Sequence, residues 1–376
     1  MFDINEYLSN LEYLVNIHSG QDSHEGITKV AEFFKEKFDG LGWNTTMHDL
    51  SPNTGNCLIC TNREADHYDL MLIGHTDTVF AKGTAAERPF SMDETKAYGP
   101  GVSDMKSGSL MMYYILRDLP KEVTDKLNIV VVYNPDEEIG SIYSYNIYEE
   151  YAKKTKYAYV YEAQSEDYAC CIERKGMISF SVVIHGIAGH VGYTFTNKTL
   201  NAVIEASRWA LRIQELESRE RNVNVNVTRI YGGEKMNVIP DEAGFSVNMR
   251  VPNNAEIDYA KTVLDRLKAE ADERGYTAKI QILEYIDPLV PSDEGYAYVG
   301  HLKDVAKSIG RDLKFKPKGG LSDANQIQKH GTICIDAMGP AGTNAHSISE
   351  FMLLESIVPT YELSTAMITD LASNKL

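Results

Sequence analysis

Long apolar runs and an excess of positive charge are both missing from this 376-residue sequence. No stretch approaches the ~18 consecutive apolar residues that a membrane-spanning helix requires, so we expect no transmembrane segment. The chain has 37 Lys and Arg residues against 54 Asp and Glu residues, which gives a formal charge of −17. Because phosphate and anionic lipid bind to basic surfaces, this balance argues against a general nucleic-acid or membrane-surface protein. The first residues contain no basic segment followed by an apolar core, so we expect no secretory signal and a cytoplasmic protein.

Cysteine is scarce as well. Five cysteines, an odd number in a long chain, fit a reducing compartment better than a disulfide framework. Cys57 and Cys60 form a CxxC motif, which is compatible with a redox or zinc site. No second CxxC follows, and the surrounding sequence NCLICT is typical of a buried strand, so we predict a structural role for both.

The order of apolar segments indicates two domains. Up to about residue 174, helical patterns alternate with apolar strands at 69–73, 127–133 and 157–161, which predicts an α/β domain with a largely parallel sheet flanked by helices. Residues 175–286 show the order strand, helix, strand, strand, helix, strand of a ferredoxin-like α+β unit. Residues 287–376 return to the first pattern and end in an amphipathic helix predicted from about Glu350. We therefore expect one domain built from 1–174 and 287–376, with residues 175–286 inserted into it.

Ionisable residues follow the predicted strands or lie in glycine-rich loops. They are His75 after 70–73, Asp104 in the loop 99–106, Glu137 and Glu138 after 129–132, Glu162 after 157–161, and His346 after the loop 339–345. In open α/β sheets, ligands bind beyond the carboxyl ends of the strands, so these strands deliver their polar residues to one edge. Two imidazoles and several carboxylates would repel one another there without a cation. A nitrogen and oxygen donor set without thiolate suits zinc, with manganese or cobalt as substitutes.

At these motifs the sequence resembles the di-zinc metallopeptidases and deacylases that include glutamate carboxypeptidase of the carboxypeptidase G type, tripeptidase, acetylornithine deacetylase and succinyl-diaminopimelate desuccinylase. The motifs are GHTDTV at 74–79, GPGVSDMKSG at 99–108 and DEEIGS at 136–141. The resemblance implies that His75 and Glu162 hold one zinc ion, that Glu138 and His346 hold a second, and that Asp104 bridges the two. It also implies that Asp77 orients His75, that Glu137 is the general base, and that the Asp104–Met105 peptide is cis.

The resemblance extends into the inserted segment, where it implies a lid or dimerisation domain and a homodimer. His190 ends the stretch GIAGH, which resembles a loop whose histidine reaches a substrate across a dimer interface. Asn237 and Arg250 match positions that bind the substrate carboxylate, a role that suits the planar guanidinium group. Gly320 lies in the stretch 319–324, which resembles the glycine-rich loop that lines the substrate pocket.

Together these matches imply a zinc-dependent exopeptidase that cleaves the amide bond to a C-terminal amino acid, with a small peptide or an N-acyl amino acid as substrate. Three alternatives stay open: an N-acyl amino acid deacylase, a di- or tripeptidase, and a non-catalytic zinc-binding scaffold. The GPG sequence before Asp104 and glutamate at position 162 favour the carboxypeptidase G type. Val191 and Phe195 depart from the family's loop and leave the preferred C-terminal residue open. His185, His301 and His330 match no motif, and we expect them at the surface or in packing roles.

Overall fold

The computed structural model describes residues 2–374, and the chain divides into two compact units. The first unit consists of Met1–Ile172, Pro291–Pro317 and Ser322–Leu376, and the second of Glu173–Val290 and Lys318–Leu321. The chain thus enters the second unit twice. The second, short segment, Lys318–Leu321, lies outside the range 175–286 that the sequence predicted for the inserted domain. The lid or dimerisation role expected for residues 175–286 stays a prediction.

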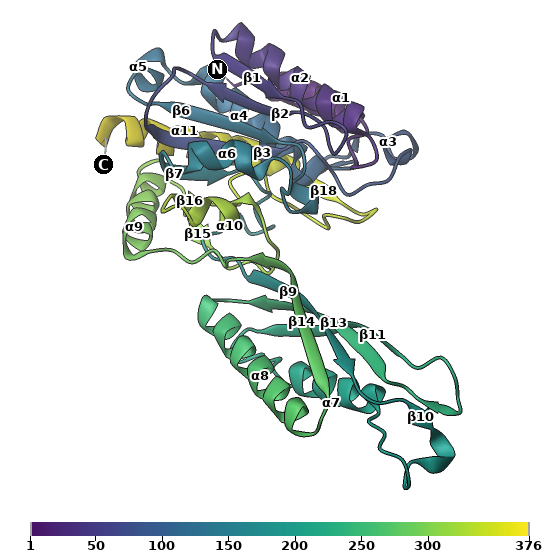
Figure 1. Ribbon diagram of the computed structural model, residues 1–376. Helices are drawn as coiled ribbons and strands as arrows, with labels where there is room; N and C mark the ends of the chain where they lie inside the picture. Colours follow the sequence, from purple (N-terminus) through teal and green to yellow (C-terminus); the bar gives the residue numbers. More distant parts are fainter. Residues whose placement is uncertain (1, 375–376) are drawn as a thin grey trace. The chain divides into compact units, whose positions relative to one another are not determined.

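A six-stranded sheet forms the centre of the first unit (Figure 1). Its strands are β1 (Asn44–His48), β2 (Cys57–Thr61), β3 (Tyr68–His75), β6 (Ile129–Asn134), β7 (Thr155–Val160) and β16 (Ile333–Ile335), in the spatial order β1-β2-β6-β3-β7-β16. From β6 to β16 neighbouring strands run parallel, whereas β1 and β2 add antiparallel pairs at one edge. Every residue of β2 and β6 is buried, as in a sheet covered on both faces. This confirms the predicted α/β class and places both CxxC cysteines in the core.

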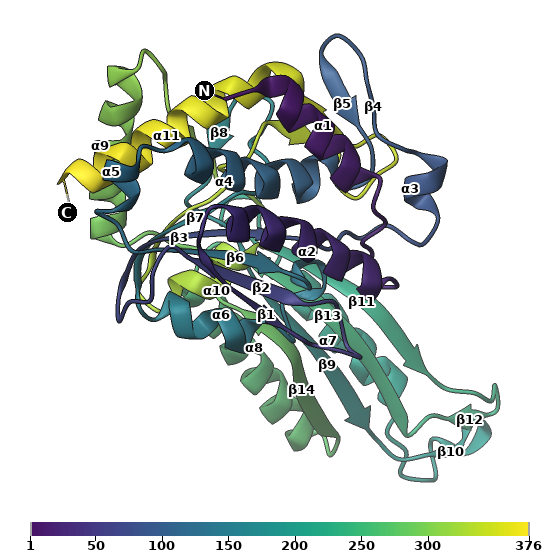
Figure 2. The ribbon, with the colours of Figure 1, turned by 90° about the horizontal axis from the view of Figure 1, so that it is seen from above.

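Helices cover both faces of this sheet (Figure 2). The helices of the first unit are α1 (Ile4–Val15), α2 (His24–Gly40), α3 (Thr84–Glu87), α4 (Ser107–Asp118), α5 (Lys121–Thr124), α6 (Tyr145–Ala152), α9 (Asp293–Ser308), α10 (Asp323–Gln328) and α11 (Ile357–Asn374). Helices α2 and α4 contact the sheet from one side, and α6 and α10 contact it from the other. Phe34 of α2 stacks on Tyr133 of β6, with ring centroids 4.0 Å apart and an interplanar angle of 10°. Within residues 2–374, no helix combines the length and the apolar character needed to cross a membrane.

A smaller antiparallel sheet of the first unit corrects one sequence-based expectation. It contains β4 (Ser91–Met92), β5 (Lys96–Tyr98), β17 (Gly342–Thr343) and β18 (Phe351–Leu353), in the order β17-β18-β5-β4. The amphipathic helix predicted from about Glu350 begins only at Ile357, so that prediction was wrong about where the helix starts. Residues 351–353 pair with β5 instead, because the backbone hydrogen bonds of a distant strand outweigh the local helical pattern. The remaining strands of the unit, β8 (Ala169–Cys170) and β15 (Lys314–Phe315), form a parallel pair.

The second unit is a four-stranded antiparallel sheet with two helices on one face. Its main elements are β9 (Gly176–His185), α7 (Ala202–Gln214), β11 (Asn224–Gly232), β13 (Glu242–Val251), α8 (Asn254–Glu273) and β14 (Thr277–Ile286), with the strand order β11-β13-β9-β14. Burial alternates along β9 and β13, so that one face packs against α7 and α8, where Phe180, Trp209 and Phe245 are buried. This is the predicted ferredoxin-like arrangement. Beyond the end of the sheet at which His185 pairs with Glu242, β10 (Gly189–His190) pairs with β12 (Val238–Ile239).

Candidate active site

Three neighbouring parallel strands of the first unit bring polar side chains to one edge of its sheet. His75 is the last residue of β3 and lies beside Asn134, the last residue of β6. Glu137 and Glu138 follow β6 in the short turn η2 (Glu137–Ile139), and Glu162 lies two residues beyond the end of β7. Since β6, β3 and β7 are adjacent and parallel, their carboxyl ends meet, as the strand-end rule requires.

Two loops complete the group from outside the main sheet. Asp104 lies in the turn η1 (Val102–Lys106) between β5 and α4, and the Asp104–Met105 peptide is cis, as the resemblance implied. His346 lies between β17 and β18 with a positive φ of 64°. These loops are neighbours because β5 and β18 pair with each other.

The Asp104 carboxylate lies between the two imidazoles. Its Oδ1 is 3.1 Å from His75 Nε2, and its Oδ2 is 3.1 Å from His346 Nε2. His346 Nε2 is also 3.1 Å from Oε2 of Glu138, whereas His75 Nε2 is 3.7 Å from Oε1 of Glu162. The structure therefore gathers all five predicted metal ligands, with one carboxylate between two sets of side chains.

Asp77 lies behind His75. Nδ1 of His75 is 3.0 Å from the Asp77 backbone oxygen and 3.3 Å from the carboxylate Oδ1. The other carboxylate oxygen accepts hydrogen bonds from Gln21 Nε2 at 2.8 Å and from the Glu138 backbone N–H at 3.0 Å. Asp77 is fully buried, and its contacts connect the His75 ring to the start of the Glu137–Glu138 turn.

The four predicted substrate-binding residues belong to the second unit. His190 and Asn237 lie at the β10–β12 end of the sheet and are both exposed. Arg250 is half-buried near the last residue of β13. The strand begins at Glu242, shortly after β12, so the eight residue steps from Glu242 to Arg250 separate Arg250 from the β10–β12 end of the sheet by about 26 Å. Gly320 accepts a hydrogen bond from Arg174 at 3.1 Å. One substrate carboxylate therefore cannot reach both Asn237 and Arg250 of the same chain.

Comparison with known proteins gives the family. Residues 71–370 match the pattern of peptidase family M20/M25/M40, which is well over half of the chain. The chain belongs to peptidase family M20/M25/M40. As a member of this family, it is a hydrolase of peptide or amide bonds.

The M20/M25/M40 chain is similar over most of its length to two named relatives. It is 28% identical to carboxypeptidase G2 of Pseudomonas sp. (strain RS-16) over 373 residues, which cover 98% of this chain and 90% of the relative. It is 27% identical to succinyl-diaminopimelate desuccinylase of Rickettsia africae (strain ESF-5), covering 78% of this chain and 81% of the relative. The crystal structure of aminopeptidase PepT from Bacillus cereus shares its fold, with a TM-score of 0.79 at 21% identity over 98% of this chain and 99% of that one.

The donor atoms of the M20/M25/M40 site suit the metal ions that this family generally binds. His75, Asp104 and Glu138 offer ligand atoms within 4.8 Å of one another, and His75, Glu137 and Glu162 form a second such group. Glu138 Oε1 is buried and receives no hydrogen bond. Buried carboxylate oxygens require a partner, so a cation fits the place at which this atom lies.

The crowded carboxylates change the protonation of the site. Hydrogen bonds to Asp104 and Glu138 raise the pKa of His346 to about 10. Burial and the neighbouring Asp104 carboxylate raise the pKa of Glu138 to about 7. Burial also raises the pKa of Glu137 well above its usual range, and the carboxylates of Glu162 and Asp323 add to this effect. Without a metal the site therefore retains protons, whose place a divalent cation could take.

Two buried carboxylates near the ligands escaped the sequence analysis as functional residues. Asp323, the first residue of α10, accepts hydrogen bonds from Asn134 Nδ2 at 2.8 Å, Ser141 Oγ at 2.7 Å and Tyr148 OH at 3.0 Å. It thereby holds both ends of the segment that carries Glu137 and Glu138. Glu350 is the second such carboxylate and contacts the Asp104 loop. No residue spacing signals either role, because both carboxylates act on segments more than 170 residues away.

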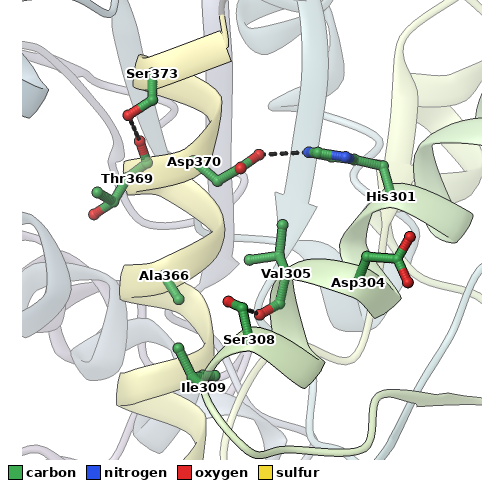
Figure 3. A pocket seen from close by; sticks show the side chains of 9 residues that line it. All are labelled: His301, Asp304, Val305, Ser308, Ile309, Ala366, Thr369, Asp370 and Ser373. Atoms are coloured by element: carbon green, nitrogen blue, oxygen red, sulfur yellow. Dashed lines mark hydrogen bonds and ion pairs between the residues drawn. The ribbon is translucent and has the colours of Figure 1, made fainter.

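A separate pocket of about 560 Å³ lies between α9 and α11 (Figure 3). At its edge His301 Nε2 is 2.5 Å from Asp370 Oδ2, and the side chains of Val305, Ile309 and Ala366 line its wall. The imidazole thus links two helices, in line with the packing role expected for His301. Neither possible metal-binding group found among residues 2–374 includes a residue of this pocket.

Proposed function

We propose that the protein is a zinc-dependent carboxypeptidase that hydrolyses the amide bond to a C-terminal amino acid, with glutamate as the favoured residue. One observation carries the proposal: opposite oxygens of Asp104 face His75 and His346, while Glu137 lies in a group with His75 and Glu162. This arrangement suits two metal ions that share one carboxylate, with a further carboxylate beside them. The similarity to carboxypeptidase G2 over 98% of the chain supports the choice of substrate class.

The proposed ligands divide into two sets. His75 and Glu162 would hold one ion, Glu138 and His346 the other, and Asp104 both. Zinc fits best because the donors are imidazole and carboxylate without thiolate, and cobalt or manganese are possible substitutes. When bound, such ions lower the pKa of water and polarise a carbonyl oxygen.

Glu137 is the proposed general base. Its carboxylate takes a proton from the attacking water and gives it to the nitrogen of the leaving amino acid. The position of Glu137 supports this role, because its carboxylate lies in one group with His75 and Glu162, beside the place proposed for the metal ions. Asp77 contributes by holding the ring of His75 in one orientation.

The proposed substrate contacts require a homodimer. Arg250 binds the substrate carboxylate, since its guanidinium group can grip both oxygens. His190 and Asn237 come from the second subunit, because about 26 Å of strand separates their end of the sheet from Arg250 in one chain. His190 then stabilises the charge that develops on the carbonyl oxygen.

The second unit offers an apolar surface for this dimer. β11 is an edge strand of its sheet, on which Ile230 and Tyr231 are 55% and 40% exposed. On the adjacent α7, Ile204 and Leu211 are 49% and 68% exposed. Exposed apolar side chains next to an edge strand, whose backbone groups are unpaired on one side, favour association with a second copy. All five cysteines are buried and none forms a disulfide, which fits the proposed cytoplasmic location.

A deacylase is the second candidate, because the similarity to succinyl-diaminopimelate desuccinylase covers 78% of the chain. A substrate panel separates the two: N-acyl glutamates of the folate type, N-acetyl amino acids, dipeptides and tripeptides. We expect release of glutamate from N-acyl glutamates, loss of this activity with a chelator and recovery with zinc. Preferential hydrolysis of N-acetyl amino acids would favour the deacylase. Hydrolysis that resists chelation, or zinc binding without any hydrolysis, would refute the proposed carboxypeptidase.

The shared site has its own test. Glu137→Gln and His190→Ala are each expected to be inactive, but mixed subunits should regain part of the activity, because one of the two sites in a mixed dimer is intact. In the control mixtures, a variant at the exposed residue Glu36, Glu36→Gln, replaces one of the two inactive variants. Light scattering should give a dimer for the wild type and a monomer for Leu211→Glu. An active monomer, or no recovery on mixing, would contradict the shared site.

A further inference from the structure

Glu350 is a buried carboxylate whose hydrogen bonds all go to the loop that carries Asp104. The side chain is fully buried. Its Oε1 accepts hydrogen bonds from the backbone N–H groups of Ser103 at 2.8 Å and Asp104 at 3.0 Å, and its Oε2 accepts one from Gly101 at 3.0 Å. Three backbone N–H groups that converge on the two oxygens of one buried side chain make a specific contact, because the loop must keep one conformation for all three hydrogen bonds to form.

The same residue lies close to a second proposed ligand along the chain. His346 precedes Glu350 by four residues in the segment between β17 and β18. β18 begins directly after Glu350 and pairs with β5, which leads into the Asp104 loop. Glu350 therefore joins the segment that supplies His346 to the segment that supplies Asp104, at the point where both leave the small sheet.

We infer that Glu350 is a positioning residue that fixes Asp104 and His346 relative to each other, so that both can hold the metal ion they share with Glu138. The inference rests on the proposed function, since it presupposes the two-metal site. Residues that hydrogen-bond to ligands or to their backbone set the direction of the ligand atoms, and their loss commonly weakens metal binding.

The two ions should depend on Glu350 to different degrees. His75 is the last residue of β3, Glu162 follows β7, and Ser109 Oγ donates a hydrogen bond to the His75 backbone oxygen at 2.9 Å. These two ligands are held by the central sheet, and Asp104 is the ligand that connects their ion to Glu350. The side chain of His346, by contrast, is 57% exposed, and its residue lies in a loop with a positive φ. The ion at Glu138 and His346 should therefore lose more affinity than the ion at His75 and Glu162.

The test measures the two zinc dissociation constants of the full chain by competition with a chromophoric chelator. Glu350→Gln keeps the shape of the side chain, and its one carbonyl oxygen can still accept the hydrogen bonds from Ser103 and Asp104. Its NH₂ group would face the N–H of Gly101, so that hydrogen bond is lost because both groups are donors. Glu350→Ala removes all three acceptors. We expect the ion at Glu138 and His346 to lose about 10- to 100-fold in affinity in the Ala variant and less in the Gln variant. The ion at His75 and Glu162 should lose less in either variant, because Asp104 is its one ligand on the segments that Glu350 joins.

The control is Glu355→Gln, five residues further along the chain. Its carboxylate accepts a hydrogen bond from Tyr168 OH at 2.6 Å and is exposed, so both dissociation constants should stay unchanged. Thermal unfolding of the metal-free proteins separates a loss of fold from a loss of positioning. If the Ala variant does not fold, the Gln variant supplies the comparison.

Equal losses at both sites, or unchanged zinc affinities in the Gln and Ala variants, would overturn the inference even if both variants were less stable. These outcomes leave the proposed function intact as long as the wild type binds two zinc ions and hydrolyses N-acyl glutamates. A wild-type protein that binds no zinc would overturn both.

Discussion

Gly108 provides a sharp test of how closely the site is packed. It is the second residue of α4, and a Cβ atom built there would lie 1.8 Å from the backbone oxygen of Tyr161, the residue before Glu162. Gly339 closes the other side, since its own Cβ would lie 2.4 Å from the same oxygen. The Tyr161 carbonyl group is therefore held between two glycines, and the sequence motif that ends at Gly108 acquires a steric reason.

Gly108→Ala should displace this carbonyl group. Cβ atoms essentially never come within 3.0 Å of another atom, so the 1.8 Å contact must open by about 1.2 Å. Overpacking of this kind costs about 1–3 kcal/mol of unfolding free energy, against a gain of about 1 kcal/mol from the helix preference of Ala over Gly. A shift of about 1 Å at Glu162 should also lower kcat/KM by about 10²-fold and weaken the binding of one zinc ion.

Gly300→Ala is the matched control. Gly300 lies inside α9, is exposed, and its Cβ would meet no atom within 4 Å. This variant should gain about 1 kcal/mol of unfolding free energy and keep its zinc affinity and activity. Denaturant unfolding, chelator competition and initial rates check all three quantities. A Gly108→Ala protein with wild-type zinc affinity and activity would refute the reasoning.

Four other predictions follow from the structure. Glu137→Gln should keep its zinc but lower kcat by about 10²–10⁴-fold, and a near wild-type rate at full zinc content would remove Glu137 as the base. Zinc affinity should rise between pH 6 and pH 8, because the raised pKa values of His346 (about 10) and Glu138 (about 7) mean that zinc must displace protons. Calorimetry in buffers of different ionisation enthalpy should detect their release, and a pH-independent affinity would contradict it. A small thiol reagent should modify none of the five buried cysteines in the native protein and all five after unfolding. Phe34→Ala should cost about 3–5 kcal/mol of unfolding free energy in denaturant titrations, because its ring is fully buried against Tyr133, and a cost below about 1 kcal/mol would contradict this packing.

The strand-end rule explains why much of the site could be predicted from the sequence. His75, Glu138 and Glu162 follow apolar strands, and parallel neighbours bring such residues together whatever the details of the loops. Asp104 and His346 lie in loops outside that sheet. Their membership of the site was therefore predicted from the resemblance to a family rather than from periodicity.

The supporting contacts could not be predicted in the same way. The roles of Glu350 and Asp323 depend on hydrogen bonds to segments more than 170 residues away, and no local pattern records such partners. The predicted helix start at about Glu350 was wrong for the same reason, since residues 351–353 pair with a strand near residue 97. The separation of Asn237 from Arg250 became visible only once the register of β13 was known.

The positions of the five proposed ligands along the chain have a consequence for synthesis and folding. Glu162 and His346 are 184 residues apart in sequence, and the whole ferredoxin-like unit is made between them. At about 5–20 residues per second, a ribosome needs about 10–40 s to cover that interval. During this time four ligands exist without the fifth, and β7 has not yet acquired its neighbour β16. The metal site is thus one of the last features to form, and a chain that stops before residue 346 carries all three acidic ligands of the proposed set but lacks the second histidine.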